Sequence, residues 1–120
     1  HITGIKRIPK EGHVWLDRFT VRNLEIFYPN SVEGKSLIDV IDRTISPMGG
    51  RLLKRWLALP STEKKLILQR HNIVQHFIDS DKDRELLIEV LNSISDLERL
   101  VSKISTKKIS PRELFNLNDL

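Results

Sequence analysis

Residues 36–60 read SLIDVIDRTISPMGGRLLKRWLALP and contain the clearest helix signals of the chain. Ser46 suits an N-cap, because its hydroxyl can accept a hydrogen bond from an early helical N–H. Pro47 suits the first helical position, where an amide proton has no partner, and Pro60 ends the helix. Apolar residues recur at spacings of three and four, which predicts one apolar helix face: Leu52, Leu53, Trp56, Leu57 and Leu59. Two helices that meet at Ser46-Pro47 are therefore predicted.

Gly49 and Gly50 lie in the first turns of the second of these helices. Each lowers helix stability by ~1 kcal/mol relative to alanine. Close approach of another helix backbone is the usual compensation. We expect such packing here, in preference to an anion bound at the helix N-terminus.

Three segments, LDRFTVRNLE at 16–25, DRTISPMGGRLLKRWLALP at 42–60 and DLER with SPREL at 96–114, together resemble the core domain of MutS-type DNA mismatch repair proteins. Residues 42–60 are similar to the family run LDRT-x-TPMG-x-RLL-x-RWL-x-x-P, and residues 16–25, LDRFTVRNLE, are similar to its LD-x-x-T-x-RNLE segment. DLER at 96–99, followed by SPREL at 110–114, is similar to the family's DLER…RPRDL segment. The resemblance spans residues 13–120, and three blocks in the family's order are more specific than any one of them.

The resemblance implies a role within a larger protein. MutS-type proteins recognise mispaired or looped DNA and couple that recognition to ATP turnover. Their core domain joins the mismatch-reading and clamp domains to the ATPase. This chain lacks the Phe-x-Glu mismatch-reading segment, the clamp and the Walker motifs, so the resemblance implies a structural relay without catalytic, cofactor or metal residues of its own. ATP, Mg²⁺, DNA contact and dimerisation are implied for the parent protein only, in a bacterial cytoplasm where DNA brings it to the nucleoid.

The expected fold is mainly α: an irregular bundle of about six helices after a short extended or two-stranded N-terminal element. Residues 1–12 read as a lead-in, and residues 13–120 as the first part of a MutS-like helical core domain, cut at the start of a long helix. Short strands are expected at 14–16 and 24–28, which are rich in β-preferring residues. The chain starts at His1 and ends on a helical pattern, so we expect it to be part of something longer.

Caps and turns predict the remaining helices. We expect one helix to start at residues 61–62 and a turn at residues 79–81. A later helix is predicted to start at Ser95, with Glu98 completing a capping box. The sequence SPRE at 110–113 combines a cap, a proline at the first helical position and a glutamate at the third, which predicts a last helix.

Composition excludes several classes of protein. The chain has 120 residues, of which 39% are hydrophobic and 30% charged, an ordinary globular balance. It has no cysteine, which excludes disulfides and thiolate zinc sites. It also has no apolar run near the ~20 residues that span a bilayer, so no membrane partner is expected. The net charge of +4 is weak evidence for an anionic partner.

Charge is distributed in blocks. From Arg43 to Arg70 there are seven basic residues and one acid, whereas from Asp79 to Arg99 there are seven acids and three bases. The main prediction is that these are solvated helix faces that complement each other. A narrower hypothesis places three cations near nucleic-acid phosphates: Arg51, Lys54 and Arg55.

Other chemistry-bearing residues do not form a site. Gly34-Lys35-Ser36 ends like a phosphate-binding loop, but the glycine that such a loop needs five residues earlier is Pro29, which has no N–H. His71 and His76 are five residues apart, which does not suit a ligand pair on one helix face. Capping and ion pairing explain the carboxylates. We therefore predict no active site, and the chain is not expected to be an enzyme.

Two other functions remain open from the residues. Residues 36–59 could form a helix-turn-helix DNA-binding module, although the apolar second helix lacks the polar side chains that read base edges. The chain could also be a helical adaptor that binds another protein. A titration with duplex DNA would separate these alternatives.

Overall fold

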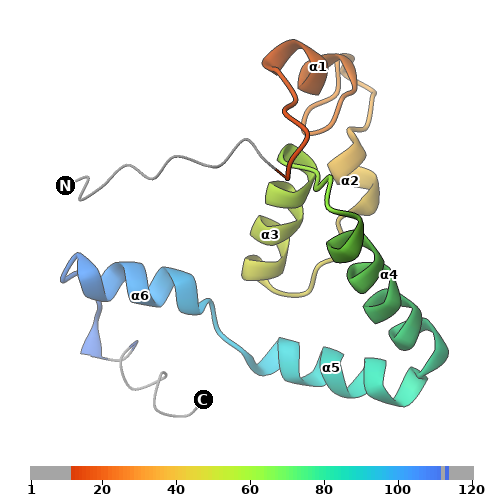
Figure 1. Ribbon diagram of the computed structural model, residues 1–120. Helices are drawn as coiled ribbons and strands as arrows, with labels where there is room; N and C mark the ends of the chain where they lie inside the picture. Colours follow the sequence, from red (N-terminus) through yellow and green to blue (C-terminus); the bar gives the residue numbers. More distant parts are fainter. Residues whose placement is uncertain (1–11, 112, 114–120) are drawn as a thin grey trace.

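The computed structural model describes residues 12–111 and 113. Within these residues the order of elements is α1 (Arg18–Asn23), α2 (Leu37–Ile41), α3 (Pro47–Ala58), α4 (Lys64–Asp79), α5 (Asp81–Ser93) and α6 (Leu97–Ser105). Figure 1 shows α1 and α2 beside the end of α3, with α4 leading away and α5 crossing below, whereas α6 begins near the start of α3 and runs away from it. The mainly α fold class is confirmed.

The N-terminal element takes the extended form. The Val14 N–H donates to the Pro60 carbonyl at 2.8 Å, and the Thr62 N–H donates to the Gly12 carbonyl at 3.0 Å. These bonds flank a single antiparallel bridge between His13 and Ser61. In the described part of the chain no further strand pairing forms around this bridge.

The strand expected at residues 24–28 is wrong, because this segment is a turn. Glu25 has a φ of 49°, which lies in the left-handed region and not in the β region. The alternation of apolar and polar residues here does not come from a strand. The turn places Ile26 inside, 5% exposed, and leaves Leu24 and Tyr28 outside.

The two helices predicted around Ser46-Pro47 are confirmed. The Ser46 hydroxyl accepts from the Gly49 N–H at 3.1 Å, and Pro47 occupies the first position of α3. The preceding helix, α2, is short and starts with a capping box in which Ser36 and Asp39 each accept from the other's backbone N–H. A loop over residues 42–46 joins them, and the Asp42 carboxylate stabilises it by accepting from the Thr44 N–H at 3.0 Å.

The space around Gly49 and Gly50 is filled by this loop and not by another helix, which corrects the packing expected from the sequence. A β-carbon on Gly49 would lie 3.2 Å from the Ser46 Oγ and 3.4 Å from the Thr44 Cβ. A β-carbon on Gly50 would lie 3.2 Å from the Thr44 Oγ1. The two glycines therefore allow the loop to fold back onto the first turns of α3.

Helices α4 and α5 meet at one residue. Ser80 ends α4 and caps α5, accepting from the Asp83 N–H at 3.4 Å. The Arg84 guanidinium donates to the Phe77 carbonyl at 3.0 Å across this corner. The expected turn at 79–81 is thus confirmed as a tight corner. None of the described helices, the 16-residue α4 included, is long and apolar enough to cross a membrane.

The cap of α6 differs from the expectation. Asp96 is the N-cap, because its carboxylate accepts from the Arg99 N–H at 3.2 Å. Ser95 lies one residue before it, and the Glu98 carboxylate points to another helix. Near the end of the chain, Ser110 and Glu113 form the predicted capping box. Continuation of that last helix beyond residue 113 lies outside the described residues.

The buried core of the described residues is small. Ile26, Ile38 and Leu100 are less than 10% exposed, whereas Leu52 and Trp56 on the apolar face of α3 are 40% and 38% exposed. The radius of gyration is 17.9 Å, compared with ~14 Å for a compact chain of this length. The expected bundle is therefore open, and its apolar helix faces are only partly covered.

One contact fixes α3 against α4. The Arg70 guanidinium lies 3.8 Å from the centroid of the Trp56 ring. Such a cation–π contact is worth ~0.5–1 kcal/mol at an exposed site. Trp56 therefore joins two helices at the surface instead of filling a core.

Candidate functional site

Arg51 joins α3 to the start of α6. Its Nη1 and Nη2 atoms donate to the two Asp96 carboxylate oxygens at 3.0 and 2.6 Å, and its Nε atom donates to the Glu98 Oε2 atom at 2.7 Å. A guanidinium that binds one carboxylate with two parallel bonds has a defined orientation as well as charge complementarity. We call these three residues the Arg51 clamp.

Local structure places both acids of the Arg51 clamp where Arg51 can reach them. Asp96 is the N-cap of α6 and Glu98 lies in its first turn. Carboxylates are favoured at this end of a helix by the unpaired N–H groups and the helix dipole. The acids therefore stabilise α6 and bind Arg51 with the same side chains.

The ion pairs shift the protonation of their members. The Arg51 guanidinium, assisted by the Arg99 N–H, holds the pKa of the Asp96 carboxyl below its ordinary value. The hydrogen bonds from Arg51 to Asp96 and then Glu98 raise the pKa of the Arg51 guanidinium further above its ordinary value. Asp96 is the least accessible member, with 19% of its side chain exposed against 46% for Arg51 and 64% for Glu98.

A pH titration should reveal this effect of Asp96. Because the pKa of its carboxyl is lower in the folded chain than in the unfolded chain, ionisation stabilises the fold. This contribution is fully present above the unfolded pKa of about 4 and is lost as pH falls through the lowered folded pKa. We expect the melting temperature of the unsubstituted chain to exceed that of Asp96→Asn at pH 6, and the difference to shrink only below about pH 4. A difference that stays constant down to pH 2 would contradict the assignment.

The Arg51 clamp closes a long excursion of the chain. Arg51 and Asp96 are separated by 45 positions, which include the end of α3 and all of α4 and α5. Figure 1 shows these three helices as the sides of an open frame whose ends meet where α6 begins. An open cavity of about 520 Å³ lies at this junction, and Met48, Leu52 and Leu91 contribute its apolar lining. The Arg51 clamp thus joins the two ends of this frame, the start of α3 and the start of α6, by ion pairs.

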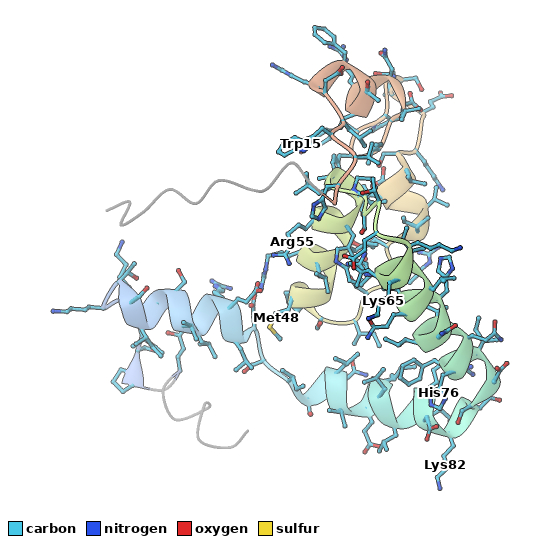
Figure 2. All side chains as sticks on the ribbon, viewed as in Figure 1. Trp15, Met48, Arg55, Lys65, His76 and Lys82 are labelled. Atoms are coloured by element: carbon cyan, nitrogen blue, oxygen red, sulfur yellow. The ribbon has the colours of Figure 1, made fainter. Side chains whose placement is uncertain are left out.

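The three cations proposed from the sequence have different surroundings in the fold. Arg51 is engaged by the two acids of α6. Lys54 lines another cavity, of about 770 Å³, together with Tyr28. Arg55 lines both this cavity and the one beside Arg51. Figure 2 shows Arg55 projecting from α3, with Met48 nearer the start of the same helix. Phosphate contact by these three residues stays a prediction.

The opposite charge blocks of the sequence do meet in the Arg51 clamp. Arg51 belongs to the basic segment and its partners belong to the acidic one, as the expectation of complementary helix faces requires. From their spacing, Asp96 and Glu98 were predicted to serve in capping and local ion pairing. The spacing did not predict their contact with Arg51. The signal available for finding the pair was the charge asymmetry of the two segments.

Ser36 and His76, which the sequence analysis rejected as phosphate-loop and metal-site residues, have local roles in the fold. Ser36 is fully buried, and its hydroxyl donates to the Asp39 carboxylate at 2.6 Å while it caps α2. The His76 Nε2 atom lies 3.1 Å from the Asp83 carboxylate at the α4–α5 corner. Within the described ranges no cluster of three or more His, Cys, Asp or Glu side chains has the arrangement of a metal site.

Comparisons with known proteins agree with the resemblance. The family model "MutS domain III" matches residues 19–120. The DNA mismatch repair protein MutS of Flavobacterium psychrophilum is 47% identical over 119 residues, and that of Christiangramia forsetii is 50% identical over 119 residues. The MutS of Bacteroides thetaiotaomicron is 48% identical over 117 residues. These alignments cover 98–99% of this chain but only 14% of the length of each relative. The chain belongs to the MutS domain III family.

Proposed function

We propose that this chain serves, within a full-length MutS protein, as a helical connecting body that relays the state of the DNA-recognising parts to an ATPase domain. We assign ATP, Mg²⁺ and mismatch recognition to other parts of that protein, as the resemblance implies, and Ser36 of the Gly34-Lys35-Ser36 segment serves here as the N-cap of α2. The observation that carries the proposal is the Arg51 clamp, which ties α3 to α6 across 45 positions. Dimerisation of the full-length protein stays a prediction from the resemblance.

A relay needs an element with two arrangements that both ends can bias. The Arg51 clamp suits this role because its members are partly exposed, so water can replace the ion pairs when the helices separate. The open frame also leaves room for α6 to move relative to α3, since the cavity between them is not filled. Closed and open forms of the Arg51 clamp are the two arrangements that we propose.

The partly exposed helix faces support partners within the same protein. Leu52 and Trp56 on α3, Ile73 on α4 and Leu86 on α5 are each 38–58% exposed. Faces with this much apolar area are normally covered by another surface. We propose that neighbouring domains of the full-length protein cover them, so that movement of those domains is transmitted to the frame.

The test uses charge exchange in a full-length MutS that carries this segment. Arg51→Glu alone should reduce the stimulation of ATP turnover by mismatched DNA roughly 5- to 150-fold, the range of typical coupling energies. Basal ATP turnover and DNA affinity without nucleotide should remain. The exchange Arg51→Glu with Asp96→Arg should recover part of the stimulation. Lys82→Glu is the matched control. Lys82 lies in the first turn of α5, at the end of that helix opposite α6, and Figure 2 shows its side chain pointing away from the helices.

Full stimulation in Arg51→Glu would contradict the relay. Equal loss of basal turnover, DNA affinity and stimulation would show a merely structural role, and would also contradict it. A helix-turn-helix reader makes a different prediction, namely selection of a defined duplex sequence at least ~10³-fold over bulk DNA.

A further inference from the structure

The loop after α1 displays an aromatic side chain to solvent. Tyr28 is 81% exposed, although Ile26, two residues earlier, is only 5% exposed. A lone exposed aromatic residue carries little information by itself. The backbone around Tyr28, however, is fixed at both ends of the loop by contacts that the helices alone do not require.

The first end is a strained helix terminus. The Glu25 N–H donates to the Arg22 carbonyl at 3.0 Å, and the Ile26 N–H donates to the Val21 carbonyl at 3.2 Å, which together form a Schellman motif. The motif places Glu25 at a φ of 49°, a conformation that glycine adopts most easily. Glutamate at this position brings a carboxylate that accepts from the Asn30 N–H at 2.8 Å. The strained residue thus fixes the far side of the loop.

Three further bonds complete the fixation. The Asn30 side-chain amide donates to the Arg22 carbonyl at 3.2 Å. The Leu37 N–H donates to the Glu25 carbonyl at 2.8 Å, and the Ile38 N–H donates to the Ile26 carbonyl at 3.0 Å. The loop that presents Tyr28 is therefore ordered before any ligand arrives, which removes part of the entropy cost of binding.

Cations lie on both sides of this loop. On one side, Arg18 and Arg22 line a cavity of about 450 Å³ together with Tyr28. On the other side, Lys54 and Arg55 line the cavity of about 770 Å³ that Tyr28 also borders. Among the described residues, none of these four cations belongs to an ion pair.

Two acids at this surface, Glu25 and Asp39, are already engaged. The Glu25 carboxylate accepts from the Asn30 N–H. Asp39 lines the larger of the two cavities. Its carboxylate accepts from the Ser36 N–H at 3.0 Å and from the Ser36 hydroxyl at 2.6 Å. These bonds hold the Asp39 carboxylate against the start of α2. The four cations outnumber Glu25 and Asp39, so this surface carries a net positive charge.

We propose that Tyr28 and its four flanking cations bind a single strand of nucleic acid. An exposed ring offers a stacking surface for an unpaired base, and cations on both sides of it match the phosphates that precede and follow that base. Duplex DNA offers no free base face away from its ends, and a peptide of Asp and Glu has no aromatic face to stack on the ring. The expected binding is therefore strand-dependent, salt-dependent and indifferent to sequence. It does not depend on the proposed relay, which rests on Arg51.

The test is fluorescence anisotropy of the 120-residue chain with a labelled oligothymidylate of about 12 nucleotides and with a duplex of equal length, at two salt concentrations. We expect the single strand to bind more tightly than the duplex. Tyr28→Ala should weaken binding of the single strand about tenfold, and Tyr28→Phe should retain it. The double variant Arg18→Ala/Arg22→Ala should reduce the salt dependence, whereas Lys82→Ala should change neither quantity.

Tyr28→Ala is suitable because the side chain is exposed and its removal leaves the buried Ile26 in place. Circular dichroism checks that each variant keeps its helix content. Equal affinity of Tyr28→Ala and the unsubstituted chain would overturn the proposal. So would tighter binding of the duplex, equal loss in Lys82→Ala, or displacement of the oligonucleotide by polyglutamate at equal charge.

Discussion

Replacing Ile38 with alanine is expected to lower the free energy of unfolding by about 2–4 kcal/mol. Ile38 is 6% exposed and belongs to the small set of buried apolar residues in the described part of the chain. Its backbone N–H also donates to the Ile26 carbonyl at 3.0 Å, so its helix and the loop before it meet at this residue. With so small a core, a cavity here removes a large share of the available burial.

Ile41→Ala is the matched control for Ile38→Ala. Ile41 is the same residue type in the same helix but is 40% exposed, so its loss should cost less than half as much. Urea denaturation followed by circular dichroism measures both. Equal destabilisation by the two substitutions would show that Ile38 is not the residue that anchors α2.

Local helix signals were predictable from the sequence because they depend on neighbouring atoms. Ser46 caps α3 by accepting from the Gly49 N–H at 3.1 Å, and Pro47 occupies the first position of that helix, as expected. The capping box of Ser110 with Glu113 is also present. In each case the donor and acceptor lie within three positions, so spacing alone determines whether they can meet.

Two local predictions were wrong because another interaction took the place of the expected one. Residues 24–28 alternate like a strand, but the Schellman motif turns the chain at Glu25. Ser95 was expected to cap α6, but Asp96 provides the cap, and Glu98 binds Arg51 instead of the helix start. Periodicity does not distinguish a strand from a turn that buries one residue, and a capping pattern does not show that its glutamate has another partner.

Burial was overestimated on α3. The spacing of Trp56 places it on a predicted apolar face. If its side chain were fully buried, Trp56→Ala would lower the free energy of unfolding by about 3–5 kcal/mol. Trp56 is instead 38% exposed, with Arg70 over its ring. Periodicity identifies which face is apolar but not what covers it. The same limit applies to the Arg51 clamp, because no local spacing links residues that are 45 positions apart.

Loss of the Arg51 clamp is expected to release α6 from α3. The described contacts between these helices centre on Arg51, whose three hydrogen bonds to Asp96 and Glu98 have no replacement after truncation. In Arg51→Ala, α3 no longer offers a cation to these two acids, so both ion pairs that join the helices are lost. Local helix structure should persist, because both helices keep their own caps.

The most direct measurement is the distance between α3 and α6 by double electron–electron resonance. The chain has no native cysteine, so spin labels can be placed specifically at Lys54→Cys and Ser102→Cys, both exposed. We predict a narrow distance distribution in the labelled chain and in the control Arg99→Ala, and a broad, longer distribution in Arg51→Ala. Superimposable distributions with and without Arg51 would contradict the claim that this residue closes the frame.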